Sequence, residues 1–180
     1  MRFILPVFLL LLNAWSAQTI GVLNKHHIKK NCAFWSEYVK TIEQLKRNYE
    51  VELVELEDQA TELLKKLDEL RIKIPPVDTS STENELFKIQ TEGTAKSNRA
   101  KENLTFLAAT TKELYEQAYK KSVADVAQKR KTDLIFDRAL MEHISDSTID
   151  ITDDVIDQLN KQLPAKKFQE IYEKVPHDKL

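Results

Sequence analysis

The sequence predicts an α+β fold, in which a long antiparallel coiled-coil helical hairpin joins a small β body made of short strands. Three observations lead to this prediction. The 180 residues include two glycines and 31% charged residues, which is typical of long helices. Apolar residues follow a heptad-like spacing on both sides of a Pro-Pro pair at residues 75–76. Short β-branched segments lie near both ends of the helical stretch.

A signal peptide is predicted at residues 1–16, with cleavage near Ser16/Ala17. Arg2 precedes an apolar run that ends at Leu12 and is too short to span a bilayer. An uncleaved membrane anchor is the alternative, which this length disfavours. We therefore expect an exported chain.

Thiol, metal and cofactor chemistry are not predicted. Cys32 is the single cysteine, so an exported chain must be held together by packing or oligomerisation and not by intrachain disulfides. His26 and His27 precede it, but neighbouring residues point in different directions and lack further ligands at helical spacing. The acidic pair Asp153 and Asp154 is explained by a helix N-terminus. With no catalytic motif present, we expect neither an enzyme nor a cofactor.

The helical arm is predicted over residues 34–132, with its tip near 75–82. Pro75 ends the first helix, and Thr82 with Glu85 forms a capping box that starts the second. The seam of the first helix comprises Trp35, Tyr38, Ile42, Leu45, Tyr49, Leu53, Leu56, Ala60, Leu63, Leu67, Leu70 and Ile74.

The second helix has a weaker seam near the tip. Gly93, Ser97 and Asn98 dilute it, so we expect the distal half of the hairpin to be the more mobile half. The seam resumes at Ala100, Leu104, Leu107, Thr111, Leu114 and Ala118.

Short apolar segments on either side of the arm are predicted to form the β body. Residues 19–24 (TIGVLN) are expected to form a strand that pairs with residues 133–137 (DLIFD). Residues 138–144 (RALMEHI) are expected to fold back on DLIFD as a hairpin across Arg138 and Ala139.

The chain is predicted to finish with a helix and a tail. The β body comprises residues 19–24 and 133–163, including a terminal amphipathic helix with Thr152 as its N-cap. Together with the arm it forms a single domain over residues 17–163. Residues 164–180 are expected to be a polar tail.

Charge and short motifs add little to this picture. Lysines alternate with glutamates, as on a solvated coiled-coil face, so nucleic-acid binding is not expected. The basic cluster at residues 127–133 is interpreted as a solvated face, with contact to acidic lipid or a client as the alternative. Residues 103–105 (NLT) match a glycosylation sequon, which has meaning only in a eukaryotic host.

The order and spacing of these elements resemble the Skp/OmpH family of periplasmic chaperones over nearly the whole mature chain. The resemblance rests on IGVLN at residues 20–24, DLIFD at 133–137 and IDITDDVIDQLNKQL at 149–163. It implies an ATP-independent periplasmic holdase for unfolded outer-membrane proteins. An envelope coiled-coil protein without clients is the alternative, and a prefoldin-like chaperone is disfavoured by the signal peptide.

The resemblance also implies a homotrimer, whose subunits share one β body. Three short strands cannot bury both faces of their own sheet, so sister strands are expected to complete it. The expected oligomerisation residues are Ile20, Val22, Leu134, Ile135, Phe136, Leu140 and Ile144, with Ile156 nearby.

Client contacts are expected on the arm surface and near its tip. Leu86, Phe87 and Ile89 are the candidates, with packing against Ile72 and Ile74 as their alternative role. Charges over residues 65–102 nearly balance, unlike the basic arms of well-known family members. Contact with membrane or lipopolysaccharide is therefore expected to be weak.

Overall fold

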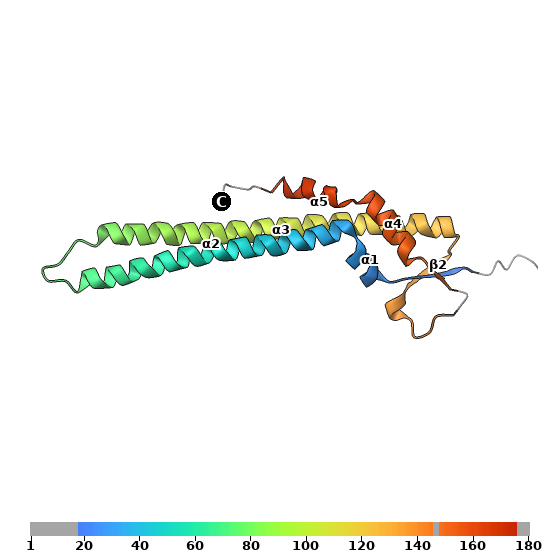
Figure 1. The fold of residues 1–180 in the computed structure, drawn as a ribbon, viewed down its shortest axis with the longest axis horizontal. Coiled ribbons are helices and arrows are strands. Elements are labelled where there is room, and N and C mark those ends of the chain that lie inside the picture. The colour runs from blue at the N-terminus through green and yellow to red at the C-terminus, as the bar shows by residue number, and fades with distance from the viewer. Residues whose placement is uncertain (1–17, 146–147, 176–180) are drawn as a thin grey trace, which may run out of the picture. The chain divides into compact units, whose positions relative to one another are not determined.

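The computed structural model describes residues 18–145 and 148–175, and the predicted signal peptide lies outside these ranges. The elements are β1 (Ile20–Leu23), α1 (Lys25–Asn31), α2 (Ala33–Arg71), α3 (Ser80–Arg130), β2 (Leu134–Asp137), η1 (Arg138–Leu140), β3 (Ile149–Asp150), α4 (Thr152–Gln162) and α5 (Ala165–Tyr172) (Figure 1). Two long helices and a small sheet of short strands confirm the predicted α+β class.

The described chain forms two compact units. One contains residues 18–32 and 117–162, and therefore the sheet with α1 and α4. The other contains residues 33–116 and 163–175, and therefore α2, most of α3, and α5.

The sheet has β1 at its centre, in the strand order β2-β1-β3, and both neighbours run parallel to it. Ile20 lies opposite Leu134, and Val22 lies opposite Phe136. The predicted pairing of residues 19–24 with 133–137 is thus correct. Parallel strands need a long connection, and the helical stretch provides it between β1 and β2.

The predicted hairpin between residues 133–137 and 138–144 is wrong. The chain instead turns into η1 after β2, because the Asp137 carboxylate accepts a hydrogen bond from the Ala139 backbone nitrogen at 3.2 Å. Arg138 then pairs with Asp150 of β3 at 3.3 Å. The third strand is β3, on the far side of β1.

The start of α4 also differs from the prediction. Thr152 is the first residue of the helix, and its hydroxyl accepts a hydrogen bond from the Asn24 backbone nitrogen at 3.0 Å. The Asp150 carboxylate accepts from the Thr152 backbone nitrogen at 2.9 Å. Burial alone would raise the pKa of Asp150, but hydrogen bonds from Thr152 and the charge of Arg138 lower it. Thr152 therefore ties the end of β1 to α4.

The core of this unit lies where α1 and α4 meet the central strand. Its buried apolar side chains are Val22, Leu23, Ile28, Cys32, Val126, Ile151, Val155 and Leu159. Ile156, expected near the assembly surface, is half-buried.

Position 21 in β1 requires glycine, because other residues of the chain approach it closely. A Cβ at this position would lie 2.7 Å from Thr132 Cγ2, which is closer than a van der Waals contact. We expect Gly21→Ala to lower the free energy of unfolding by about 1–3 kcal/mol, because Thr132 or the strand must shift. Urea denaturation measures this loss, and an unchanged midpoint would contradict it.

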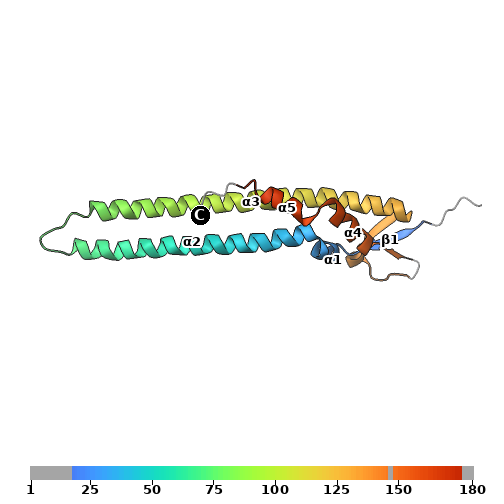
Figure 2. The same cartoon turned by 45° about the horizontal axis from the view of Figure 1, so that its top comes forward.

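In the second unit, α2 and α3 run antiparallel as a hairpin (Figures 1 and 2). The predicted seam positions of α2 through Leu70 are all buried or half-buried, while Val51, Val54 and Leu64 on other faces are exposed. Ile74 is an exception, since α2 ends at Arg71 and leaves this side chain 96% exposed.

At the tip of the hairpin, the second helix begins earlier than predicted. α3 begins at Ser80, whose backbone nitrogen donates to the Asp78 carboxylate at 2.9 Å. Hydrogen bonds from the Ser80 hydroxyl and from its backbone nitrogen hold the pKa of Asp78 below its usual value. Thr82 and Glu85 therefore lie inside the helix. Arg71 pairs with Glu83 at 3.1 Å and links the ends of the two helices.

Residues 164–180, expected as a polar tail, contain the helix α5. Phe168 and Ile171 are buried, and Val175 beyond the helix is buried as well. The i, i+3 and i+7 spacing of these three residues forms one apolar face, which three lysines and two glutamates obscure in the sequence.

Candidate functional site

The sheet unit exposes an apolar surface around β2. Side chains alternate along a strand, so Ile20, Leu134 and Phe136 lie on the same face. They are 37%, 41% and 44% exposed, and Leu140 in η1 is 82% exposed. We call these four residues the sheet surface. β2 and β3 are also edge strands, each with one side free of the pairing seen in this chain.

The other three predicted oligomerisation residues are less available. Val22 is 1% exposed and belongs to the core of its own chain. Ile135 and Ile144 are half-buried. Strand alternation places Ile20 and Val22 on the same face. It does not reveal that the Val22 end of this face is covered.

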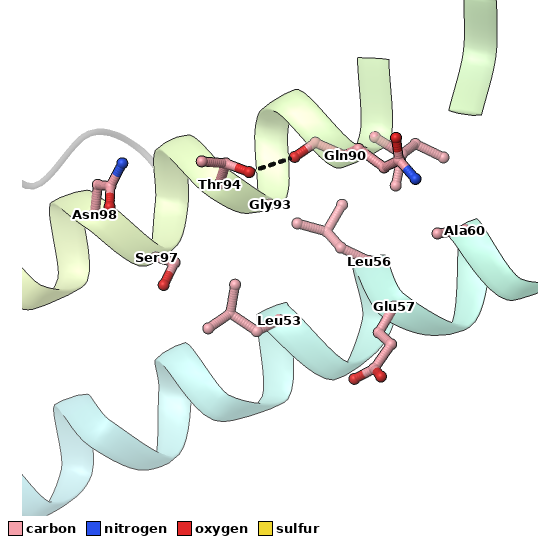
Figure 3. Close-up of a pocket in the computed structure, with 10 residues that line it drawn as sticks. Leu53, Leu56, Glu57, Ala60, Gln90, Gly93, Thr94, Ser97 and Asn98 are labelled. Carbon is pink, nitrogen blue, oxygen red and sulfur yellow. Dashed lines mark hydrogen bonds between the residues drawn. The ribbon is translucent and has the colours of Figure 1, made fainter. Parts of the chain in front are cut away.

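A groove of about 450 Å³ lies between α2 and α3 in the distal arm. Figure 3 shows Leu53 and Leu56 of α2 pointing toward α3, where Gly93 and Ser97 stand opposite them. Because these two residues carry little or no side chain, the seam is incompletely filled at this level. This is the stretch in which the sequence predicts a diluted seam.

Adding one methyl group to this groove should stabilise the hairpin. A Cβ at Gly93 would lie 3.9 Å from Leu56 Cδ1, an ordinary van der Waals contact. Alanine also has the higher helix propensity, so we expect Gly93→Ala to raise the free energy of unfolding by about 1 kcal/mol. Urea denaturation checks this value, and a loss comparable to that expected for Gly21→Ala would contradict it.

Nearer the base, a polar contact crosses the hairpin. The Asn103 side-chain amide donates to the Tyr49 hydroxyl at 3.1 Å, and Asn103 is 7% exposed. Sequence reasoning treated Asn103 as part of a glycosylation sequon, but its amide faces the seam. The spacing of Asn103 from Leu107 was the available signal, since residues four apart share a helix face.

The basal arm is aromatic. The ring centroid of Trp35 lies 5.1 Å from Tyr38 of the same helix and 5.2 Å from Tyr115 of α3. Burial raises the pKa of the Tyr38 phenol. Aromatic packing therefore joins the two helices at this level, in contrast to the open distal groove.

Thr111 occupies a predicted apolar seam position, and the fully buried hydroxyl has no hydrogen-bond partner among the described residues. Valine has a similar shape without the unsatisfied group. We expect Thr111→Val to raise the free energy of unfolding by about 1 kcal/mol. Thermal and urea denaturation test this, with the half-buried neighbour Thr110→Val as a control that should change little. A loss of stability in Thr111→Val would contradict the structure.

The tip carries the predicted client-contact residues. Phe87 is 68% exposed, whereas Leu86 and Ile89 are half-buried, and Ile89 lines the distal groove. Ile72 and Ile74 are 80% and 96% exposed, so packing against them does not explain this cluster. The tip thus presents several apolar side chains to solvent.

Within residues 18–145 and 148–175, His, Cys, Asp and Glu do not gather in groups of three that could hold a metal ion. In the same ranges, every helix is too short or too polar to cross a membrane. The surfaces that the described chain offers are apolar patches and open grooves.

Comparisons with known proteins agree with this architecture. The family model described as outer membrane protein (OmpH-like) matches residues 19–159. A search of curated proteins gave no match. A crystal structure from Caulobacter crescentus CB15, described as an OmpH-like outer membrane chaperone, superposes with a TM-score of 0.63 at 14% identity, covering 81% of this chain and 85% of that one.

The two comparisons differ in what they establish. At this identity the solved structure shows a shared fold. The family model spans most of the chain, and the family comprises non-enzymatic chaperones that are periplasmic in general. Membership of this family supports a chaperone role. The chain belongs to the OmpH-like outer membrane protein family.

Proposed function

We propose that this protein is an ATP-independent periplasmic holdase, which binds unfolded outer-membrane proteins between the arms of a homotrimer and prevents their aggregation. The observation that carries the proposal is the exposed sheet surface, formed by Ile20, Leu134, Phe136 and Leu140. An exported chain that leaves these side chains in solvent gains stability by covering them with sister subunits.

Assembly through the sheet fits the geometry of the strands. β2 and β3 each have one edge that no other described strand pairs with, and β3 has two residues. Edge strands of this kind invite pairing with another chain. Closing the assembly with three copies would cover the edges and the sheet surface together, and would place several arms around a shared space.

The arms support client binding by many weak contacts. The tip exposes Phe87, Ile72 and Ile74, and the distal groove adds a surface that combines apolar and polar side chains. Weak contacts on several arms combine through avidity, so a client is held without one deep pocket. Release then needs only a stronger acceptor and no nucleotide.

The test is aggregation of a urea-unfolded porin on dilution into nucleotide-free buffer. The mature protein is supplied at about one trimer per porin, and its native mass is measured first by multi-angle light scattering. We expect a trimer that suppresses light scattering by the porin. A trimer without suppression would overturn the holdase role, and a monomeric mass would overturn the shared cavity.

A further inference from the structure

The helix α5 lies beyond the part of the chain that matches the family. The match ends at residue 159, and α5 begins at Ala165 after the short link Leu163–Pro164. Pro164 precedes the helix without a side-chain capping hydrogen bond. The match to the family therefore says nothing of what α5 does.

The contact between α5 and α2 is aromatic. Phe168 is fully buried, and its ring centroid lies 5.9 Å from Phe34 and 5.8 Å from Tyr38, both in edge-to-face arrangements. Tyr172 stacks beside Phe168 at 6.4 Å. Without α5, Phe34 and Tyr38 would lose their ring contacts with Phe168.

The margin of the same contact is polar and open. The Gln169 side-chain amide donates to the Glu37 carboxylate at 2.6 Å. Beside this hydrogen bond runs a groove of about 250 Å³, whose lining includes Lys40, Thr41 and Tyr172. The contact thus consists of one apolar stripe with a groove along its margin.

A detached α5 would not persist as a helix. It has eight residues, and helices this short are not stable alone in water. Docking and helix formation are thus coupled, and opening would release an unfolded segment and remove Phe168 from Phe34 and Tyr38 together.

We propose that α5 is a built-in cover over an aromatic binding surface on α2, centred on Phe34 and Tyr38, and that a client segment carrying aromatic and aliphatic side chains competes with it. This inference rests on the proposed holdase function and names a site for it. Strands of membrane β-barrels alternate apolar and polar residues, so an unfolded one offers such side chains repeatedly. A client binds only molecules in which α5 has opened. Its apparent affinity is therefore the intrinsic affinity multiplied by the fraction of open molecules.

Opening the cover tests the proposal. Phe168→Ala removes the side chain that seats α5, and Glu170→Ala is the matched control, since Glu170 pairs with Lys167 at 2.8 Å in an exposed contact on α5. Affinity for a urea-unfolded porin is measured by fluorescence anisotropy. We expect Phe168→Ala to bind about three- to tenfold more tightly than wild type, and Glu170→Ala to bind as wild type does.

Closing the cover provides the second measurement. Glu37→Cys with Gln169→Cys, in a Cys32→Ala background, allows a short bismaleimide to tether α5 to α2. We expect the tethered protein to bind the porin more weakly than the same variant before cross-linking. Circular dichroism and thermal melts of every variant report whether the hairpin is intact.

The outcomes separate the two proposals. If Phe168→Ala destabilises the hairpin without raising affinity and tethering changes nothing, α5 is a structural brace and the cover is wrong, although the holdase role stands. If wild type and all variants leave porin aggregation unchanged, the proposed function fails and the cover fails with it. Binding by Phe168→Ala where wild type binds weakly would support the cover most strongly.

Discussion

Replacing Leu134 and Phe136 together with aspartate is expected to convert the proposed trimer into monomers. Both side chains are more than 40% exposed in the single chain, and burying each at an interface contributes about 1.5–3 kcal/mol. The carboxylates would have to be desolvated without partners, which costs several kcal/mol more. Light scattering and native mass spectrometry should report the monomer mass.

The matched control for this prediction is Phe87→Asp at the arm tip. Phe87 is 68% exposed and lies in the other compact unit, so its replacement should leave the native mass unchanged. Circular dichroism should show equal helix content in wild type and both variants. Retention of the wild-type mass by the Leu134→Asp/Phe136→Asp protein would place the interface elsewhere.

Leu107→Ala is expected to lower the free energy of unfolding of the hairpin by about 2–5 kcal/mol. Leu107 is fully buried, at the point where the seam of α3 tightens again after the distal groove. Truncation would leave a cavity between α2 and α3, which the surrounding side chains fill only in part. Urea denaturation followed by circular dichroism measures the loss.

The control is the neighbouring residue Phe106, whose side chain is larger than that of Leu107. Phe106 is 48% exposed and stands outside the seam. Phe106→Ala should therefore cost less than about 1 kcal/mol, despite removing more atoms. Similar losses for the two variants would show that the heptad pattern does not define the packed face.

The hairpin could be predicted from the sequence because its signal is long and periodic. Residues such as Leu45, Leu67 and Leu107 recur at a spacing that one helix face requires, and the structure buries all three. Gly93 and Ser97 predicted the diluted seam for the same reason, since small residues at seam positions leave space.

The short elements outside the hairpin lacked such a signal. β3 has two residues, too few for an alternation to be recognised, and the turn after β2 depends on one carboxylate of Asp137. α5 has an apolar face formed by Phe168 and Ile171 among lysines and glutamates. Short elements of this kind are set by tertiary contacts, which a pattern in one segment does not contain. The trimer and the client contacts at the tip stay predictions.

The position of β1 in the sheet sets an order of events for folding. The backbone nitrogen of Thr19 donates to the Asp133 carboxylate at 2.8 Å, across 114 residues of chain. The helices of the arm form from contacts close in sequence, whereas the central strand waits for both of its neighbours to be made. A chain emerging from its N-terminus therefore builds the arm first and completes the sheet almost at its end. In the trimer that we propose, subunits would meet through the sheet only after emergence, so assembly would be the last step and would depend on subunit concentration.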